Sequence, residues 1–244
     1  MKVHLVGVGG GHPDQVTVQA IEKLQQVDVF LVADKGDGVG DLAEARTEIL
    51  RRHVTGDYRV VQVPDPARDR TPSDYGTAVT DWHEARAHAY REVLDGLPSD
   101  TVVGFLVWGD PSLYDSTIRV VEQLGVEFDV TPGVSSVSML AASHRIVLNR
   151  IGGPIVITTG RALQKDVAAG ADNLVVMLDG GLACRELVGS RPWDIYWGAN
   201  LGTEDEKLVA GVLDDVVDEI ASIRAELKAR HGWVMDIYVL RARR

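Results

Sequence analysis

Hydrophobic and polar positions alternate in blocks along the first half of the chain. Short runs rich in Val, Ile, Leu and Phe are separated by longer stretches in which apolar residues recur every three or four positions. The short runs predict β-strands near residues 3–8, 28–33, 59–63, 101–107 and 126–130. The longer stretches predict helices near residues 14–26, 40–53, 74–95 and 113–124. This alternation is typical of an α/β fold, in which helices cover both faces of a parallel sheet.

The pattern changes around Thr131-Pro132-Gly133, where a turn leads into a helix predicted near 134–144. Further strands are predicted near residues 155–159, 174–178, 194–198, 206–213 and 234–240. Fewer helical stretches separate these strands, so we expect a mixed sheet, followed by a last helix that ends at Gly232. We therefore predict two α/β domains, one over residues 1–133 and one over residues 134–244.

The composition is that of a globular protein, with 45% hydrophobic and 25% charged residues. The net charge of −11 disfavours nucleic acid as a partner, because binding to phosphates requires cations. No apolar run approaches the roughly 20 residues of a membrane helix, and the first residues enter a strand, so we expect a cytoplasmic protein without a membrane partner. Cys184 is the sole cysteine, which leaves no disulfide framework. A polyanionic substrate would require a local cluster of arginines.

Four glycines in five positions follow the first strand, in Gly7-Val8-Gly9-Gly10-Gly11-His12-Pro13-Asp14. The spacing does not match GxGxxG, since His12 and Asp14 stand where that motif needs glycine. Asp34 ends the second strand, where the ribose-binding acid of a dinucleotide site would lie, so a nicotinamide or flavin protein remains an alternative. A strand-to-helix turn with Pro13 in its first helical turn explains the proline, whereas so many glycines favour close approach of a ligand to the backbone.

The stretch Trp108-Gly-Asp-Pro-Ser-Leu-Tyr-Asp115 follows the fourth strand of the first half. Pro111 presets a helix start, and Ser112 and Asp115 have the spacing of a capping box. Gly109 and Asp110 are not explained by local structure, so Asp110 is either a helix cap or an acceptor for ligand N–H or hydroxyl groups.

A third such turn, Pro132-Gly-Val-Ser-Ser136, places two serines at a helix start. Ser135 and Ser136 are either N-cap residues or ligand donors. Three turns of this kind at strand ends favour a common binding site.

We expect no metal site. His83 and His88 resemble the zinc motif HExxH, but the second histidine comes one position too late, so the two would point about 140° apart around a helix. This stretch is interpreted as a solvated helix face. The sequence also lacks a GK[ST] phosphate loop and a GxSxG nucleophile turn.

Taken together, the turns resemble those of the class III, tetrapyrrole-methylase type methyltransferases that use S-adenosylmethionine. The similar segments are GVGGGHPDQVT (7–17), VDVFLVAD (27–34), WGDPSLYD (108–115), TPGVSS (131–136), NLVVMLDG (173–180) and GANLGTEDE (198–206). Other passages, among them YRVVQVPDPARDR (58–70) and DIYWGANLGT (194–203), resemble family members of aerobic cobalamin biosynthesis. That resemblance implies methylation of precorrin-5 at C-1, with release of acetate.

The resemblance also implies the arrangement of the site. It implies two domains with the cofactor, S-adenosyl-L-methionine, in a cleft between them, S-adenosyl-L-homocysteine as its product, and a homodimer. The residues that match cofactor contacts in the family are Gly9, Pro13, Gly109, Asp110, Pro111, Tyr114, Ser135, Ser136, Met177 and Leu201. Asp34 matches an acid that some relatives place near the reacting carbon, and we hypothesise that it accepts a proton, with His12 on a turn facing the same side.

The chain departs from the family pattern at Phe105. Many relatives that methylate uroporphyrinogen have arginine five residues before the aspartate that corresponds to Asp110 in the Gly-Asp-Pro motif, and here that position is Phe105. Other cations must then hold the substrate carboxylates, and we predict Arg145, Arg150, Arg161 and either Arg68 or Arg70, although each fits a surface arginine equally well.

Three alternatives to this function remain open at this stage. The chain could methylate another tetrapyrrole or a modified protein histidine, it could be a nicotinamide-dependent reductase, or it could bind a small molecule without turnover.

Overall fold

The chain folds into two units, each with its own five-stranded sheet. The computed structural model describes residues 1–34, 40–67 and 74–243, and it divides the chain into Met1–Ser135 and Ser136–Arg244. All the strands predicted from the sequence are present, with ends that differ by at most two residues.

The sheet of the first unit is parallel throughout. Its strands are β1 (Lys2–Gly7), β2 (Val29–Asp34), β3 (Arg59–Pro64), β4 (Val102–Val107) and β5 (Glu127–Thr131). They lie in the order β3-β2-β4-β1-β5, so β3 and β5 form the edges. The predicted parallel sheet is therefore confirmed.

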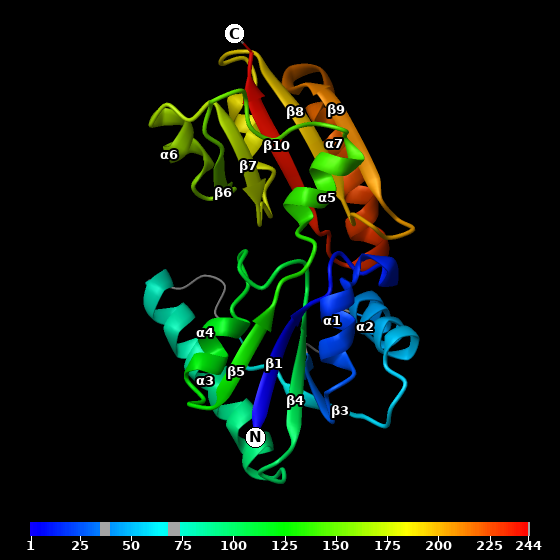
Figure 1. Cartoon of the computed structure of the whole chain (residues 1–244). Helices are drawn as coiled ribbons and strands as arrows, with labels where there is room; N and C mark the ends of the chain where they lie inside the picture. The colour runs from blue at the N-terminus through cyan, green and yellow to red at the C-terminus, as the bar shows by residue number, and fades with distance from the viewer. Residues whose placement is uncertain (35–39, 68–73, 244) are drawn as a thin grey trace. The chain divides into compact units, whose positions relative to one another are not determined.

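Helices cover both faces of this sheet (Figure 1). Their bounds are η1 (Pro13–Gln15), α1 (Val18–Leu24), α2 (Gly40–His53), α3 (Tyr75–Asp95) and α4 (Thr117–Glu122). Apolar residues of α1 and α2 share one core cluster with Val6, Phe30 and Leu106, and those of α3 and α4 share another with Leu5 and Phe105. The connections after β1 and β4 thus leave neighbouring strands toward opposite faces, which is the topology at which open α/β sheets bind ligands.

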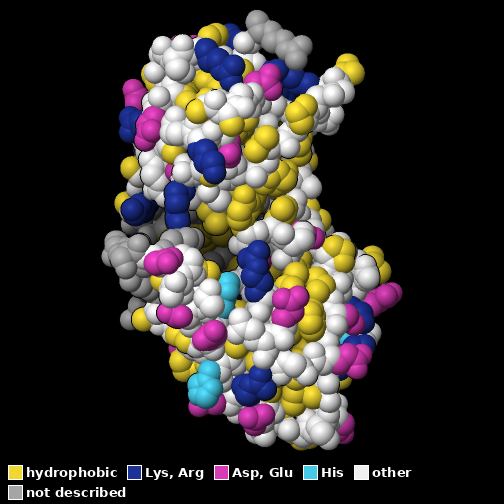
Figure 2. Space-filling view, turned by 90° about the vertical axis from the view of Figure 1, so that its left-hand side faces the viewer, with side chains coloured by type: hydrophobic (Ala, Val, Ile, Leu, Met, Phe, Trp, Pro, Cys, Tyr) yellow, Lys and Arg dark blue, Asp and Glu magenta, His cyan; other side chains and the backbone are white. Residues whose placement is uncertain are grey.

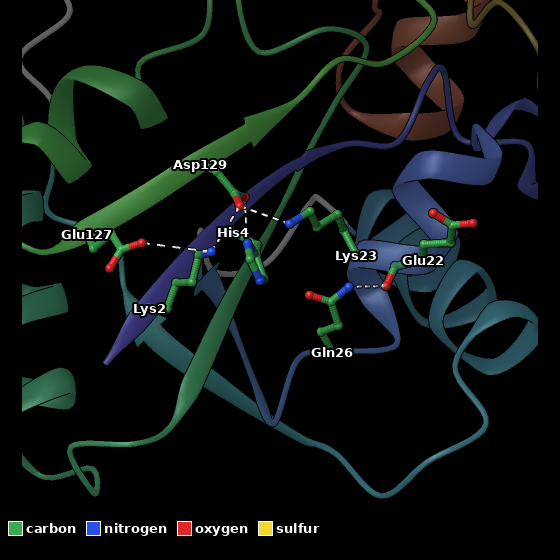
Figure 3. Close-up of polar contacts among 7 residues, drawn as sticks. All are labelled: Lys2, His4, Glu22, Lys23, Gln26, Glu127 and Asp129. Atoms are coloured by element: carbon green, nitrogen blue, oxygen red, sulfur yellow. Dashed lines mark hydrogen bonds and ion pairs between the residues drawn. The ribbon is translucent and has the colours of Figure 1, made fainter.

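A partly buried polar cluster joins β1, β5 and α1 (Figure 3). The side chain of His4 is 1% exposed, and its Nδ1 lies 2.5 Å from a carboxylate oxygen of Asp129. Lys23 of α1 donates to the other oxygen at 2.9 Å, and the Lys2 ammonium lies 3.6 Å from it. Partial burial raises the pKa of Asp129, but the hydrogen bonds from Lys23 and His4 outweigh it and hold that pKa below its usual value. These contacts fix the edge strand β5 and the helix α1 against β1.

The sheet of the second unit is mixed, as predicted. Its strands are β6 (Val156–Thr159), β7 (Asn173–Met177), β8 (Trp193–Ala199), β9 (Lys207–Val212) and β10 (Asp236–Ala242). They lie in the order β6-β7-β10-β8-β9; β6 and β7 are parallel, the other pairs are antiparallel, and β6 and β9 form the edges. Its helices are α5 (Ser136–Ser143), α6 (Leu163–Ala168), η2 (Ala183–Leu187) and α7 (Leu213–His231). Gly232 ends α7 with a φ of 77°, which confirms the predicted helix end.

A second buried polar network lies beneath the turn after β7. The carboxylate of Asp179, 5% exposed, accepts from the Tyr238 hydroxyl at 2.5 Å and from the amides of Gly181 and Ala183. Burial raises the pKa of Tyr238 above its usual value and raises that of the Cys184 thiol to about 12. The network fixes the turn that follows Met177.

Acidic and basic side chains are intermixed on the surface shown in Figure 2. Among the described residues, no helix is both long and apolar enough to cross a membrane.

Candidate functional site

The backbone turns after β1, β4 and β5 meet in direct contact. A Cβ atom placed on Gly133 would lie 2.1 Å from the carbonyl oxygen of Gly109, and one placed on Gly7 would lie 2.5 Å from the amide nitrogen of Gly133. Gly9 and Gly109 exchange backbone hydrogen bonds of 2.8 and 3.3 Å as an isolated bridge. We call Gly7, Gly9, Gly109 and Gly133 the glycine corner. Only glycine fits at Gly7 and Gly133, because any side chain would separate the turns.

Asp110 links two of these turns. Its carboxylate accepts from the amide of Gly133 at 3.0 Å, from the amide of Ser112 at 2.9 Å and from the Ser112 hydroxyl. Partial burial raises the pKa of Asp110, but these hydrogen bonds outweigh it and the net shift is downward. Asp110 is therefore a charged side chain that holds the β4 turn against the β5 turn.

The predicted capping box is wrong. The helix α4 begins at Thr117, and the carboxylate of Asp115 accepts from the Thr117 amide at 2.6 Å while Ser112 bonds to Asp110. Pro111 consequently lies in the turn and does not begin the helix. Asp110 is not the cap of α4 either, because six residues separate it from that helix.

The glycine-rich loop has the positive backbone angles that its composition suggests. Gly9 has a φ of 75° and Gly11 a φ of 117°, and a Cβ on Gly11 would lie 3.2 Å from the Trp108 ring. The amide of Gly10 donates to the side chain of Gln15 at 3.1 Å. The loop thus returns on itself beside the β4 turn.

The two residues predicted to be catalytic both lie at the carboxyl edge of the first sheet. His12 caps the short helix that Pro13 opens, and its ring accepts from the Asp14 amide at 3.2 Å. Its side chain is 50% exposed. Asp34 is the last residue of β2 and is exposed. Since β4 separates β2 from β1, the two residues flank the strand that leads into the Gly109–Asp110 turn.

Three further predicted cofactor contacts follow the same strand ends. Tyr114 lies in the turn after β4 with a φ of 51° and is 45% exposed. Ser135 ends the first unit, and Ser136 begins α5 in the second.

In the second unit, Met177 and Leu201 lie at one edge of the sheet. Met177 ends β7 and its carbonyl accepts from the amide of Gly160 at 3.2 Å. Leu201 follows β8, is 6% exposed and packs against Gly198. Both strands are antiparallel to β10, which lies between them, so their carboxyl ends share an edge.

The predicted substrate-binding arginines differ in their surroundings. Arg145 and Arg161 are exposed. The guanidinium of Arg150 donates to the carboxylate of Asp172 at 2.8 Å and to the carbonyl of Ala242. It therefore stabilises the fold of the second unit. Arg68 and Arg70 lie outside the described residues.

Two arginines that the sequence analysis did not single out lie close to the site. Arg46 of α2 places its guanidinium carbon 5.1 Å from the centre of the Trp108 ring. Arg86 of α3 forms an ion pair with Asp65 at 2.8 Å and donates to the Tyr90 hydroxyl at 3.3 Å. The sequence feature that could have pointed to Arg46 is Trp108, which lies directly before the Gly-Asp-Pro turn.

Within the described ranges, no group of three or more His, Cys, Asp or Glu side chains could hold a metal ion. The prediction of a solvated helix face is wrong for His83, which is 8% exposed because it shares the inward face of α3 with Ala87 and Tyr90. His88 is exposed, and its Nε2 lies 3.4 Å from a carboxylate oxygen of Glu92.

The chain matches the model of a known enzyme family over most of its length. Residues 2–217 match the model of the Tetrapyrrole (Corrin/Porphyrin) Methylases. The chain is a member of this methyltransferase family.

Among its relatives is a precorrin-6A synthase [deacetylating] from Sinorhizobium sp. The two are 43% identical over 98% of this chain and 95% of that protein. The crystal structure of a cobalamin-synthesis-related protein, CobF, from Corynebacterium diphtheriae has a TM-score of 0.84 and 36% identity, covering 99% of each chain. The uroporphyrin-III C-methyltransferase of Thermus thermophilus, solved with S-adenosylhomocysteine, has the same fold with a TM-score of 0.61 and 20% identity, covering 99% of this chain and 92% of that one.

Proposed function

We propose that the chain is an S-adenosylmethionine-dependent C-methyltransferase of cobalamin biosynthesis that converts precorrin-5 to precorrin-6A. Its 43% identity to a precorrin-6A synthase over nearly the whole length of both proteins supports this assignment. The observation in the structure that supports it best is the glycine corner, where three strand ends present bare backbone at one point.

The reaction combines a methyl transfer with a hydrolysis. S-adenosylmethionine would supply the methyl group to C-1 of precorrin-5 and leave as the neutral thioether, and the macrocycle would then carry the positive charge. Water would add to the acyl carbon of the extruded fragment, and the bond to the macrocycle would break. Its electron pair would return to the macrocycle and neutralise that charge, and acetate and two protons would be released. For the first step the protein mainly needs to hold the two carbons in line at roughly 3 Å.

The cofactor site in this proposal combines residues of both units. Gly9 and Pro13 form its floor, Gly109, Asp110, Pro111 and Tyr114 hold the nucleoside, and Ser135 and Ser136 contact it where the units join. Met177 and Leu201 close it from the second unit, so the cofactor occupies a cleft between residues 1–133 and 134–244. The hydrogen-bonded carboxylate of Asp110 supports this assignment, since it fixes the turn that would face the ligand.

Asp34 is the proposed proton acceptor of the hydrolytic step, with His12 nearby at the same edge. Both are solvent-accessible at strand ends, which is where a base can reach a bound substrate. Asp34→Asn should abolish acetate release while leaving affinity for S-adenosylhomocysteine unchanged. Acetate release at the unmodified rate would remove Asp34 from the mechanism.

The remaining parts of the proposal concern the substrate and the assembly. Arg145 and Arg161, with Arg150 and Arg68, are the proposed partners of the substrate carboxylates; Arg150 would have to exchange its contact with Asp172 for the substrate. We propose a cytoplasmic homodimer.

The decisive experiment is incubation of the chain with methyl-labelled S-adenosylmethionine and precorrin-5. We expect one labelled methyl group on the pigment by mass spectrometry and one equivalent of acetate. Methylation without acetate would favour another tetrapyrrole reaction of the same fold. Calorimetric binding of NADPH in place of S-adenosylhomocysteine would favour the reductase alternative.

A further inference from the structure

Arg46 is a half-buried cation in the first unit. Burial is the main cause that lowers its pKa, and the neighbouring positive charge of Arg86 adds to it. Within the described part of the chain, Arg51, Arg52 and Arg86 of helices α2 and α3 form ion pairs, whereas Arg46 forms none. Removing a guanidinium even partly from water without a paired anion is unfavourable. An anion supplied by a ligand would offset that cost.

Trp108 adds a second donor at the same place. Its indole nitrogen is buried and has no hydrogen-bond acceptor among the residues that the structure describes. The guanidinium carbon of Arg46 lies 5.1 Å from the centre of the same ring. Buried polar groups in folded proteins are nearly always paired, so this buried indole donor, beside a guanidinium that forms no ion pair with the described residues, indicates a missing partner. A carboxylate has the matching chemistry, because it carries a negative charge and two oxygens that accept hydrogen bonds.

Neither Arg86 nor Asp115, two charged residues near Arg46, occupies its guanidinium by a direct ion pair. Arg86 is nearby, but its guanidinium is engaged by Asp65 at 2.8 Å and lies 4.6 Å from the centre of the Trp82 ring. Asp115 attracts Arg46 only from a distance, and its carboxylate accepts from the backbone of Thr117. The positive charge of Arg46 is thus not neutralised by a direct contact with either acid.

The position of this pair suits the substrate better than the cofactor. Trp108 directly follows β4, and its ring packs beside Gly11 of the glycine-rich loop. The glycine corner occupies the ends of β1, β4 and β5, whereas Arg46 reaches Trp108 from α2, the helix that follows β2. The pair therefore lies next to the glycine corner, toward the part of the edge where Asp34 ends β2.

We propose that Arg46 and Trp108 bind a peripheral carboxylate of the tetrapyrrole substrate. This inference rests on the proposed function and deepens it, since it names the groups that recognise the substrate's acidic side chains. It also provides the cation that an acidic protein needs in order to bind a polyanion. The methionine carboxylate of the cofactor has the same chemistry, so the experiment measures the two ligands separately.

The test compares binding of two stable probes, uroporphyrin and its fully esterified form, to the full chain by fluorescence titration. In Arg46→Met the stem is kept and the charge removed, and we expect uroporphyrin to bind about 10- to 100-fold more weakly. The ester should bind the variant and the unmodified chain equally, because it has no carboxylate to lose. The matched control is Arg51→Met, on the same helix but exposed and paired with Glu48, which should change neither affinity.

A second variant tests the role of the indole donor, and thermal unfolding tests whether the Arg46→Met variant keeps its fold. Trp108→Phe, which retains the ring, should weaken uroporphyrin binding by about fivefold and should leave the ester unaffected. Thermal unfolding of Arg46→Met should occur at or above the temperature of the unmodified chain, since the variant lacks a half-buried cation that has no ion pair within the described residues.

The possible outcomes separate this inference from the proposed function. If uroporphyrin binds Arg46→Met as tightly as it binds the unmodified chain, the inference is overturned and the function stands. If S-adenosylhomocysteine binding falls while uroporphyrin binding is unchanged, the carboxylate site belongs to the cofactor and the inference is again overturned. If the unmodified chain binds S-adenosylhomocysteine but neither tetrapyrrole probe, both proposals fail in their choice of substrate.

Discussion

Gly133 is the residue whose replacement should disturb the glycine corner most. An added Cβ would lie 2.1 Å from the Gly109 carbonyl oxygen and 2.7 Å from the carbonyl carbon of Gly7, both of which are backbone atoms. Gly133→Ala should therefore lower the free energy of unfolding by about 3 kcal/mol and abolish binding of S-adenosylhomocysteine. Urea unfolding and calorimetry measure the two effects.

The control for this substitution is Gly56→Ala. No heavy atom lies within 4 Å of the added Cβ at this position, so the free energy of unfolding should change by less than about 0.5 kcal/mol. Unchanged cofactor affinity in Gly133→Ala would show that the β5 turn is not part of the binding site.

Single residues show how far the sequence predicts the site. The density of glycine after β1 indicated a close backbone approach, and the structure has one. The partner of that approach, however, is another turn of the same chain, because Gly7 and Gly133 are neighbours only after the sheet has formed. Arg150 was predicted to bind substrate, and nothing in its local sequence indicates its contact with Asp172. Arg46 was missed for the same reason, since its burial depends on α3 and Trp108.

At the end of α5, a single substitution should increase the stability of the protein and weaken its binding of substrate. Arg145 has a φ of 54°, and the amides of Arg145 and Ile146 donate back to the carbonyls of Ala142 and Ala141. Glycine is the preferred residue at this left-handed position. Arg145→Gly should therefore raise the free energy of unfolding by about 1 kcal/mol, yet weaken binding of a carboxylated tetrapyrrole.

Arg145→Ala is the matched control, because it removes the charge and keeps the unfavourable backbone angle. It should reduce tetrapyrrole affinity as much as Arg145→Gly does, without the gain in stability. If Arg145→Gly is more stable and binds tetrapyrrole normally, Arg145 does not contact the substrate.

The helices and strands differ in how well the sequence predicts them. Strands buried on both faces have nearly continuous apolar runs, so their positions were predicted within two residues. The helices predicted near 14–26 and 113–124 are shorter in the structure, because side chains compete for their first amides: Thr17 caps Ala20, and Asp115 binds the amide of Thr117. The placement of β10 between β7 and β8 could not be predicted, because it depends on pairing between distant segments.

Low pH should destabilise mainly the first unit of the chain, and high pH mainly the second. In the first unit the pKa values of Asp110 and Asp129 are lowered, by hydrogen bonds that outweigh burial. Their contribution is present above the unfolded value near 4 and is lost as pH falls through the lower folded values. In the second unit burial raises the pKa values of Cys184, to about 12, and Tyr238. Their contribution is present below the unfolded value of Cys near 8.5 and is lost as pH rises from there.

Hydrogen–deuterium exchange resolved by peptide measures the two units separately. After correction for intrinsic exchange rates, protection should fall first in residues 1–135 below about pH 4 and first in residues 136–244 above about pH 8.5. Cys184→Ala should reduce the loss of protection of the second unit at high pH, because it removes one of the two groups in that unit whose pKa values are raised by burial. Equal loss of protection in both units at each extreme would contradict this account.

The outer strands of the two sheets have a consequence for how molecules of this chain meet. An edge strand offers unpaired backbone groups that can recruit a strand from another molecule and start aggregation. The edge strand β3 begins with the exposed Arg59 and ends at Pro64, and the edge strand β9 begins with the exposed Lys207. Charges and proline at these positions oppose continuous sheet growth from one copy to the next. The proposed homodimer should accordingly not form by pairing of β3 or of β9 between two copies.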